Sequence, residues 1–194
     1  MDVIRAIPQI GHPVLRRSCE PVSADELSSS EVQTLIDDMI ETMRDAEGAG
    51  IAANQVGVSL RICVIGLESN DRYPYKPPIP LTVLVNPELS FIDDAIYLNN
   101  EGCLSVPIRG DLPRQMNIDV GALDRDGNHF ARTYRGLTAG TVQHEIDHLN
   151  GMLIVDRIED TRTMSTWAMF QEHKMDRYLE RIRPAIEATE PKEA

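Results

Sequence analysis

The chain has 194 residues, of which 42% are hydrophobic and 26% charged, and its formal net charge is −12. This length suits one domain with a sizeable core, and the composition is ordinary for a globular protein. The acidic balance argues against DNA or broad nucleic-acid binding, since phosphate contacts need clustered Lys and Arg. No apolar run approaches the roughly 18 residues of a membrane span, and the first residues lack a secretory signal. We therefore expect a cytoplasmic protein without a membrane partner.

The first predicted helix covers roughly residues 31–45. Apolar residues recur there at the three- and four-residue spacing of an amphipathic helix, and Ser30 with Gln33 has the pattern of a capping box. The helix should end at the glycine-rich residues 47–50. By itself this glycine segment suits a phosphate loop, a tight turn or close packing, and no Gly-Lys-Ser/Thr follows that would favour a P-loop.

The middle of the chain predicts short strands. Residues 60–65 and 81–85 are β-branched runs, separated by a polar and proline-rich loop at residues 69–80. Residues 116–123 and 129–134 flank an Asp-Gly turn, which is a strong hairpin signal.

Two more helices are predicted after the hairpin. Residues 137–149 have an apolar face and end before Gly151, and a long C-terminal helix curves or breaks near Pro184. Because strands and helices do not alternate regularly, we expect an α+β fold. In it, antiparallel β-sheets pack around a central helix, with one N-terminal and one C-terminal helix. Residues 1–160 would form the catalytic domain and residues 161–194 a helical extension of it.

The predicted central helix carries the HExxH pattern His144-Glu145-Ile146-Asp147-His148. Residues four positions apart lie on the same helix face, so both imidazoles can bind one metal ion and Glu145 can reach a water at that metal. The alternative, two exposed histidines on a polar face, is disfavoured because the opposite face of the helix is apolar.

A catalytic metal site of this kind commonly has three protein ligands. The downstream histidine of the zinc proteases does not follow this HExxH pattern. Cys103 is the best candidate for the third ligand, since Gly102 before it allows close backbone approach and an unusual turn. For Cys19 and Cys63 we expect inert buried thiols.

Three segments of the chain together resemble the signature motifs of the peptide deformylase family, in the family's order. Residues 48–55 match Gly-x-Gly-x-Ala-Ala-x-Gln, residues 101–105 match Glu-Gly-Cys-Leu-Ser, and residues 143–149 match Gln-His-Glu-x-Asp-His-Leu. The resemblance extends over roughly residues 5–160. It departs from the family at His12, where other residues are usual, and at Asn54, where proline is common.

The resemblance implies a metal-dependent hydrolase that removes the formyl group from the N-formylmethionine of newly synthesised polypeptides and releases formate. It implies Cys103, His144 and His148 as ligands of one divalent metal ion per chain. Fe(II) is favoured by the resemblance, whereas a thiolate with two imidazoles also suits zinc, nickel or cobalt.

The resemblance also implies roles for residues beside the metal. Glu145 would take a proton from the attacking water and pass it to the departing amine. The side-chain amide of Gln55 and the backbone N–H of Leu104 would stabilise the developing oxyanion. Gly50 and Gly102 would let an extended substrate backbone pair along the cleft.

Helical geometry predicts a pocket beside the metal. Leu137, Gly140 and Thr141 lie seven, four and three residues before His144 and share its helix face. We expect them to line the pocket, with Gly140 leaving room for a methionine side chain. Glu101 and Arg114 are a hypothetical ion pair that braces the loop of the cysteine.

Two alternative functions stay open on the sequence alone. Another metal-dependent amidase or peptidase would use the same ligands, and a non-catalytic peptide-binding descendant would usually have lost Glu145 or a ligand. A basic face formed by Lys174, Arg177 and Arg181 suggests the ribosome as a partner, although a solvated face is the simpler interpretation. Apolar residues on the same helix leave a monomer and a weak homodimer open.

Overall fold

The strands form two antiparallel sheets in the computed structural model, which describes residues 3–68 and 74–189. The larger sheet has the strand order β1-β2-β3-β6-β7, and β4 pairs with β5 in the smaller one. The strands are β1 (Gly50–Ala52), β2 (Ile62–Leu67), β3 (Ile79–Phe91), β4 (Ile96–Cys103), β5 (Val106–Gln115), β6 (Asn117–Leu123) and β7 (His129–Arg135). The predicted α+β class with antiparallel sheets is confirmed.

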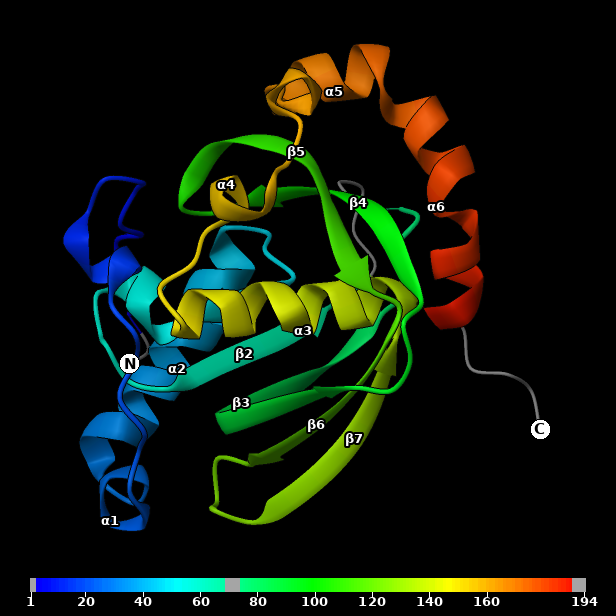
Figure 1. Cartoon of the computed structure of the whole chain (residues 1–194). Helices are drawn as coiled ribbons and strands as arrows, with labels where there is room; N and C mark the ends of the chain where they lie inside the picture. The colour runs from blue at the N-terminus through cyan, green and yellow to red at the C-terminus, as the bar shows by residue number, and fades with distance from the viewer. Residues whose placement is uncertain (1–2, 69–73, 190–194) are drawn as a thin grey trace.

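The longer helices are one near the N-terminus, one in the centre and two near the C-terminus (Figure 1). The α-helices are α1 (Ala24–Leu27), α2 (Ser30–Asp45), α3 (Gly136–Leu149), α4 (Ile154–Arg157), α5 (Trp167–His173) and α6 (Met175–Thr189). Short 3-10 helices cover η1 (Pro13–Arg16), η2 (Ala53–Val56) and η3 (Thr161–Thr163). Within the described residues, no helix has the length and apolar character needed to cross a membrane.

The central position of α3 follows from its apolar face. Val142 and Leu149 are fully buried and pack in one cluster with Cys63 and Ile65 of β2. Figure 1 shows α3 between the larger sheet and the β4–β5 hairpin. The polar face of α3, which carries the two histidines of the HExxH pattern, is therefore turned toward the hairpin and not toward solvent.

Helix α2 covers the other face of β2. Alternate residues of a strand point to opposite faces of the sheet, so Ile62 and Val64 face away from Cys63 and Ile65. They pack with Ile36 and Met39 of α2 in a second buried cluster. Burial on both faces explains why β2 reads as a continuous apolar run and not as an alternating one.

The C-terminal helices pack against β4 and the start of α3. Phe170 of α5 and Tyr178 and Ile182 of α6 form a buried cluster with Tyr97 and Leu137. Gly136 is needed at this contact, because a Cβ there would lie 2.0 Å from the Ala185 carbonyl oxygen and the backbone φ is +54°. Helices α5 and α6 are thus in close contact with the elements that carry Cys103 and the histidines.

Two local predictions were wrong. The N-cap of α2 is Ser29, whose side chain accepts a hydrogen bond from Val32 N–H, while Ser30 already lies in the helix. The side chain of Gln33 instead donates to the carbonyl oxygens of Leu27 and Arg125. The C-terminal helix breaks at Lys174 and not near Pro184, which lies inside α6.

The position of the break follows from aromatic packing. Phe170 in α5 and Tyr178 in α6 have ring centroids 5.3 Å apart, so the chain must bend between them. The predicted loop at residues 69–80 lies partly outside the described residues, and its end, Ile79 and Pro80, belongs to β3.

Candidate active site

Three side chains from two elements converge on one point. The ligand atoms of Cys103, at the end of β4, and of His144 and His148, one turn apart on α3, all lie within 4.8 Å of one another. The Cys103 Sγ is 3.2 Å from His148 Nε2. For a metal with an S distance of about 2.3 Å and an N distance of about 2.0 Å, tetrahedral ligand atoms are separated by roughly 3.5 Å. The predicted ligand set is therefore brought together with the spacing of a small metal site.

The tight turn after Cys103 directs its thiol toward α3. Cys103 pairs with Val106 across the hairpin, so Leu104 and Ser105 form a two-residue turn, and the strand register shifts between Glu101 and Cys103. Ser105 N–H donates to the Cys103 Sγ at 3.4 Å. This turn is the local structure that the Glu-Gly-Cys-Leu-Ser segment forms.

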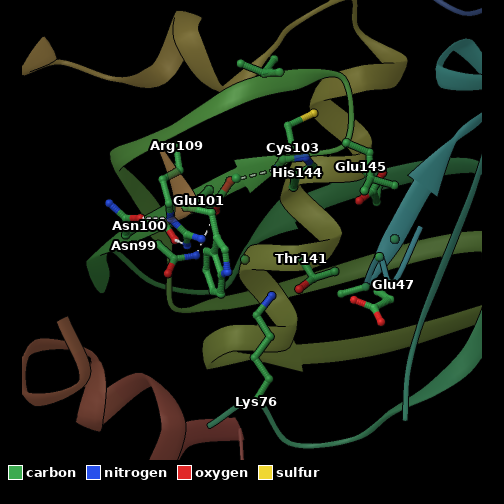
Figure 2. Close-up of a pocket in the computed structure, with 18 of the residues that line it drawn as sticks. Glu47, Lys76, Asn99, Asn100, Glu101, Cys103, Arg109, Thr141, His144 and Glu145 are labelled. Atoms are coloured by element: carbon green, nitrogen blue, oxygen red, sulfur yellow. Dashed lines mark hydrogen bonds and ion pairs between the residues drawn. The ribbon is translucent and has the colours of Figure 1, made fainter. Parts of the chain in front are cut away.

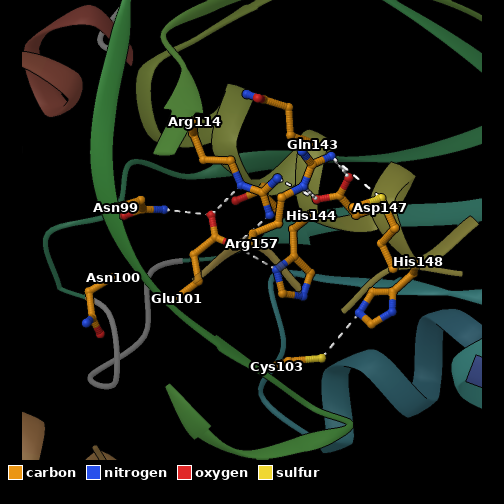
Figure 3. A network of polar contacts seen from close by, with 12 residues as sticks. Asn99, Asn100, Glu101, Cys103, Arg114, Gln143, His144, Asp147, His148 and Arg157 are labelled. Carbon is orange, nitrogen blue, oxygen red and sulfur yellow. Dashed lines mark hydrogen bonds and ion pairs between the residues drawn. The ribbon is translucent and has the colours of Figure 1, made fainter. Parts of the chain in front are cut away.

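Glu101 orients the first histidine. Its Oε2 lies 2.9 Å from His144 Nδ1, which leaves His144 Nε2 for a metal (Figure 3). A carboxylate on the second ring nitrogen of a metal-binding histidine fixes the ring and raises its basicity. Burial would raise the pKa of Glu101, but Arg114 and His144 outweigh that effect and hold the pKa well below its usual range. Glu101 is therefore a stable anion beside the site.

Arg114 holds two buried carboxylates at once. It donates to both oxygens of Glu101 at 2.8 Å and to Asp147 Oδ2 at 2.6 Å. Asp147 also accepts two hydrogen bonds from Arg157. The predicted Glu101–Arg114 ion pair is confirmed, and it extends to α3 and α4 through Asp147, as Figure 3 shows.

Replacing Arg114 by Met is expected to lower the free energy of unfolding by about 3–5 kcal/mol. The loss is large because Glu101, which is only 7% exposed, would lose its guanidinium partner and remain as a buried charge, whereas Asp147 keeps its ion pair with Arg157. Urea denaturation measures the change. Arg44→Met is the control: Arg44 pairs with Glu41 on the surface of α2, and its loss should change stability by less than about 0.5 kcal/mol. Equal stability of the two variants would contradict the structural role of Arg114.

Glu145 is buried next to the ligands. Its side chain is enclosed by β1, where Gly50 is required, because a Cβ at that position would lie 2.3 Å from Glu145 Oε1. Its Oε2 is buried and has no hydrogen-bond partner among the described residues, so that oxygen is available to a water or a substrate. Burial raises the pKa of Glu145 to about 7, which suits a group that accepts and returns a proton near neutral pH.

Gln55 presents its amide nitrogen to the site. Its Oε1 accepts a hydrogen bond from Ala52 N–H at 3.0 Å, which fixes the orientation of the amide. The Nε2 donates to Ser105 Oγ at 3.2 Å and lies 3.6 Å from Cys103 Sγ. Gln55 is thus a buried, oriented N–H donor next to the proposed metal position.

A pocket opens beside the ligands (Figure 2). Gly50, Gly102, Leu104, Gly140 and Thr141 line it. Residues from the segment after β2 and from the C-terminal helices complete the wall. These residues are Tyr75, Lys76, Trp167 and Tyr178.

The structure differs from the predicted pocket at Leu137 and adds a second reason for glycine at position 140. Leu137 is buried in the aromatic cluster with Phe170 and Tyr178 instead of lining the pocket. Gly140 lines the pocket, and a Cβ there would lie 2.3 Å from the Tyr97 hydroxyl oxygen, so glycine at this position is also needed for the packing of Tyr97. Helical spacing alone does not predict these contacts, because the side chains that pack on this face of α3 come from β4 and α6.

Cys19 and Cys63 lie in the core and are free thiols. Burial raises the pKa of Cys19 to about 11 and that of Cys63 well above its usual value, so both are protonated near neutral pH. The prediction that they are inert buried thiols agrees with this environment.

An α+β fold with a Cys/His/His ligand group and an adjacent buried carboxylate is typical of metal-dependent hydrolases. The sequence model of the polypeptide deformylase family matches residues 4–164 of the chain. The chain is 43% identical over 172 residues to peptide deformylase 1 of Bordetella pertussis, covering 88% of this chain and 97% of that protein. The chain therefore belongs to the polypeptide deformylase family.

Solved structures agree with this assignment. A class I type b peptide deformylase from Acinetobacter baumannii with bound Met-Ala-Ser superposes with a TM-score of 0.78 at 40% identity, covering 81% of this chain and 100% of that one. A peptide deformylase from Synechococcus elongatus in complex with actinonin has a TM-score of 0.72 at 30% identity, covering 98% and 94%.

Proposed function

We propose that Cys103, His144 and His148 hold one divalent metal ion and that Glu145, Gln55 and Leu104 carry out deformylation beside it. The reaction is that of a peptide deformylase: hydrolysis of the N-formyl amide of N-formylmethionine on a newly synthesised polypeptide, with release of formate. The observation that carries the proposal is the convergence of the three ligand atoms beside the buried carboxylate of Glu145.

The chemistry of the donor set fits a divalent transition metal. A soft thiolate with two imidazoles suits zinc or Fe(II) better than a hard cation, and we propose Fe(II) with zinc, nickel and cobalt as competitors. Burial lowers the pKa of His148, so its imidazole is neutral and keeps a lone pair for a metal. When bound, such an ion lowers the pKa of a water and polarises a carbonyl oxygen.

Glu145 performs the proton transfers in this proposal. Its free Oε2 accepts a proton from the water as the water oxygen bonds to the formyl carbon. As the C–N bond breaks, Glu145 returns the proton to the amine nitrogen. The products are formate and a free N-terminus, and the carboxylate is regenerated.

Gln55 and Leu104 stabilise the negative charge that develops on the formyl oxygen. The Gln55 Nε2 is held toward the site by the Ala52 N–H bond to its Oε1, and Leu104 follows the cysteine directly in the turn. Each preorganised donor of this kind typically raises kcat by about 10²–10³-fold. Gly50 and Gly102 line the same cleft and are proposed to lie along the substrate backbone.

The two rival functions have less support. A peptide-binding descendant without activity would not need a buried carboxylate at Glu145. A Cβ at position 50 would collide with this carboxylate, so Gly50 is required for its placement. A general peptidase would use the same ligands, and its substrates separate it from a deformylase.

The test uses three peptides with the sequence Met-Ala-Ser: N-formylated, N-acetylated and unblocked. We expect formate and free Met-Ala-Ser from the first, and little cleavage of the others, measured by formate release and mass spectrometry. Cleavage of the Met-Ala or Ala-Ser bond at a similar rate with or without a formyl group would contradict deformylase function and favour the peptidase.

Contact with the ribosome stays a prediction. The structure gives little support to the basic face of Lys174, Arg177 and Arg181 as the contact surface. Arg181 donates to Asp111 at 2.6 Å and Lys174 donates to the Thr163 carbonyl at 2.8 Å, so two of the three basic residues bind within the chain. The oligomeric state also stays open. Since nascent chains are made in the cytoplasm, we expect the protein to act there.

A further inference from the structure

A row of hydrogen bonds connects α6 to the proposed ligand His144. The Tyr178 hydroxyl donates to Asn99 Oδ1 at 2.8 Å, and Asn99 Nδ2 donates to Glu101 Oε1 at 3.0 Å. The other oxygen of Glu101 lies 2.9 Å from His144 Nδ1. Tyr178, Asn99 and Glu101 are 3%, 6% and 7% exposed, so bulk water does not compete for these bonds.

The Tyr178 hydroxyl holds the Asn99 amide in the orientation that Glu101 needs, because it donates to the oxygen end while the carboxylate accepts from the NH₂ end. An amide has one accepting end and one donating end, and the two are similar in shape. With the hydroxyl donating to Oδ1, the NH₂ group must point to the Glu101 carboxylate. Without the hydroxyl, the buried Oδ1 loses its donor, so the amide is held less firmly in line with the carboxylate. A side chain on α6 therefore supports a charge-assisted bond to Glu101.

We propose that Tyr178 is a positioning residue for the metal site, acting through Asn99 and Glu101 on His144. This inference rests on the proposed function, because it takes His144 to be a metal ligand. Tyr178 lies beyond residues 4–164, which the family's sequence model matches. Helix α6 is then part of the catalytic unit and not an accessory extension.

The hydroxyl can be removed without disturbing the ring. The Tyr178 ring packs edge-on against Phe170 and Tyr75, with centroids 5.3 and 5.7 Å apart, and lines the substrate pocket. Tyr178→Phe keeps these contacts and deletes one donor. A change in metal affinity then reports on the row of hydrogen bonds, whereas a change in KM alone reports on the pocket wall.

The matched control is Tyr97→Phe. Tyr97 belongs to the same buried cluster, and its hydroxyl donates to the Gly136 carbonyl at 3.0 Å instead of to Asn99. Both variants lose one buried tyrosine hydroxyl, and because the Tyr178 hydroxyl also has a hydrogen bond with the Tyr75 side chain, Tyr178→Phe should lower Tm at least as much as Tyr97→Phe. Only Tyr178→Phe should affect the metal.

The experiment measures the Zn²⁺ dissociation constant of each full-length variant by competition with a chromogenic chelator, together with kcat, KM and Tm. Removing a residue that directly orients a metal ligand typically lowers metal affinity or activity by 10- to 100-fold. Because Tyr178 acts one residue further away, we expect about 3- to 10-fold weaker Zn²⁺ binding and a similar fall in kcat, with KM unchanged. Tyr97→Phe should bind Zn²⁺ like the wild type.

A double variant tests whether Tyr178 acts through Asn99. In an Asn99→Leu background the amide is absent, so adding Tyr178→Phe should weaken Zn²⁺ binding no further. Wild-type Zn²⁺ affinity in Tyr178→Phe, or equal weakening in Tyr97→Phe, would overturn the inference while leaving the metal site in place. Absence of Zn²⁺ binding by the wild-type chain would instead overturn the proposed function itself.

Discussion

Glu145→Gln is expected to lower kcat for formate release by about 10²–10⁴-fold, the usual contribution of a general acid–base group. Glutamine has the same size and still fits against Gly50, but it cannot accept the proton of the attacking water. Metal binding should stay at one ion per chain, because the ligands Cys103, His144 and His148 are unchanged. The loss should therefore appear in kcat, with little change in KM.

The matched control for this variant is Glu159→Gln, which removes an exposed carboxylate outside the pocket. It should keep wild-type kcat. Steady-state formate release, metal content and Tm are measured for both variants. Formate release that survives in metal-loaded, folded Glu145→Gln at the wild-type rate would contradict the assignment of Glu145.

The periodic parts of the fold were predictable from the sequence. The apolar spacing of α2 and α3 and the Asp-Gly hairpin of β6 and β7 all identify elements that the structure contains. The helical spacing of His144 and His148 also predicted that both rings meet at one point. These predictions succeed because they depend on local geometry, which is the same wherever the helix packs.

The β4–β5 hairpin has no such local signal. Its strands contain Asn99, Asn100, Glu101, Arg109 and Arg114, all of them buried. An alternating apolar pattern is absent because the buried side chains on one face of the hairpin are polar, and they form hydrogen bonds and ion pairs instead of apolar contacts. The Glu101–Arg114 pair is predictable as a hypothesis, but no local pattern indicates that Asp147, Arg157 or Asn99 belongs to the same network.

Long-range neighbours explain the errors in the pocket. Leu137 shares the helix face of His144, yet the space next to it is filled by Tyr97 from β4 and by α6, and Tyr97 also lies against Gly140. Tyr178 was assigned only to a C-terminal helix, because its contact with Asn99 spans 79 residues of sequence. Such contacts are set by how the elements pack and not by local spacing.

Removing the metal, or the thiolate that helps to hold it, should abolish formate release. Cys103→Ala deletes a ligand of a three-ligand site, and the two remaining imidazoles, with ring centroids 5.0 Å apart, leave the ion more weakly held. Cys19→Ala is the matched control, because Cys19 is a buried thiol in the core cluster and outside the ligand group. It should bind one metal per chain and keep the wild-type activity.

The most direct test is an anaerobic titration of the metal-free wild-type chain with Fe(II), in which bound metal and the rate of formate release are measured together. The rate should be at background without metal, rise in proportion to the bound ion, and stop rising at one ion per chain, with Cys103→Ala staying near background throughout. Full activity in the metal-free chain, or a Cys103→Ala variant that binds Fe(II) and releases formate like the wild type, would contradict the account.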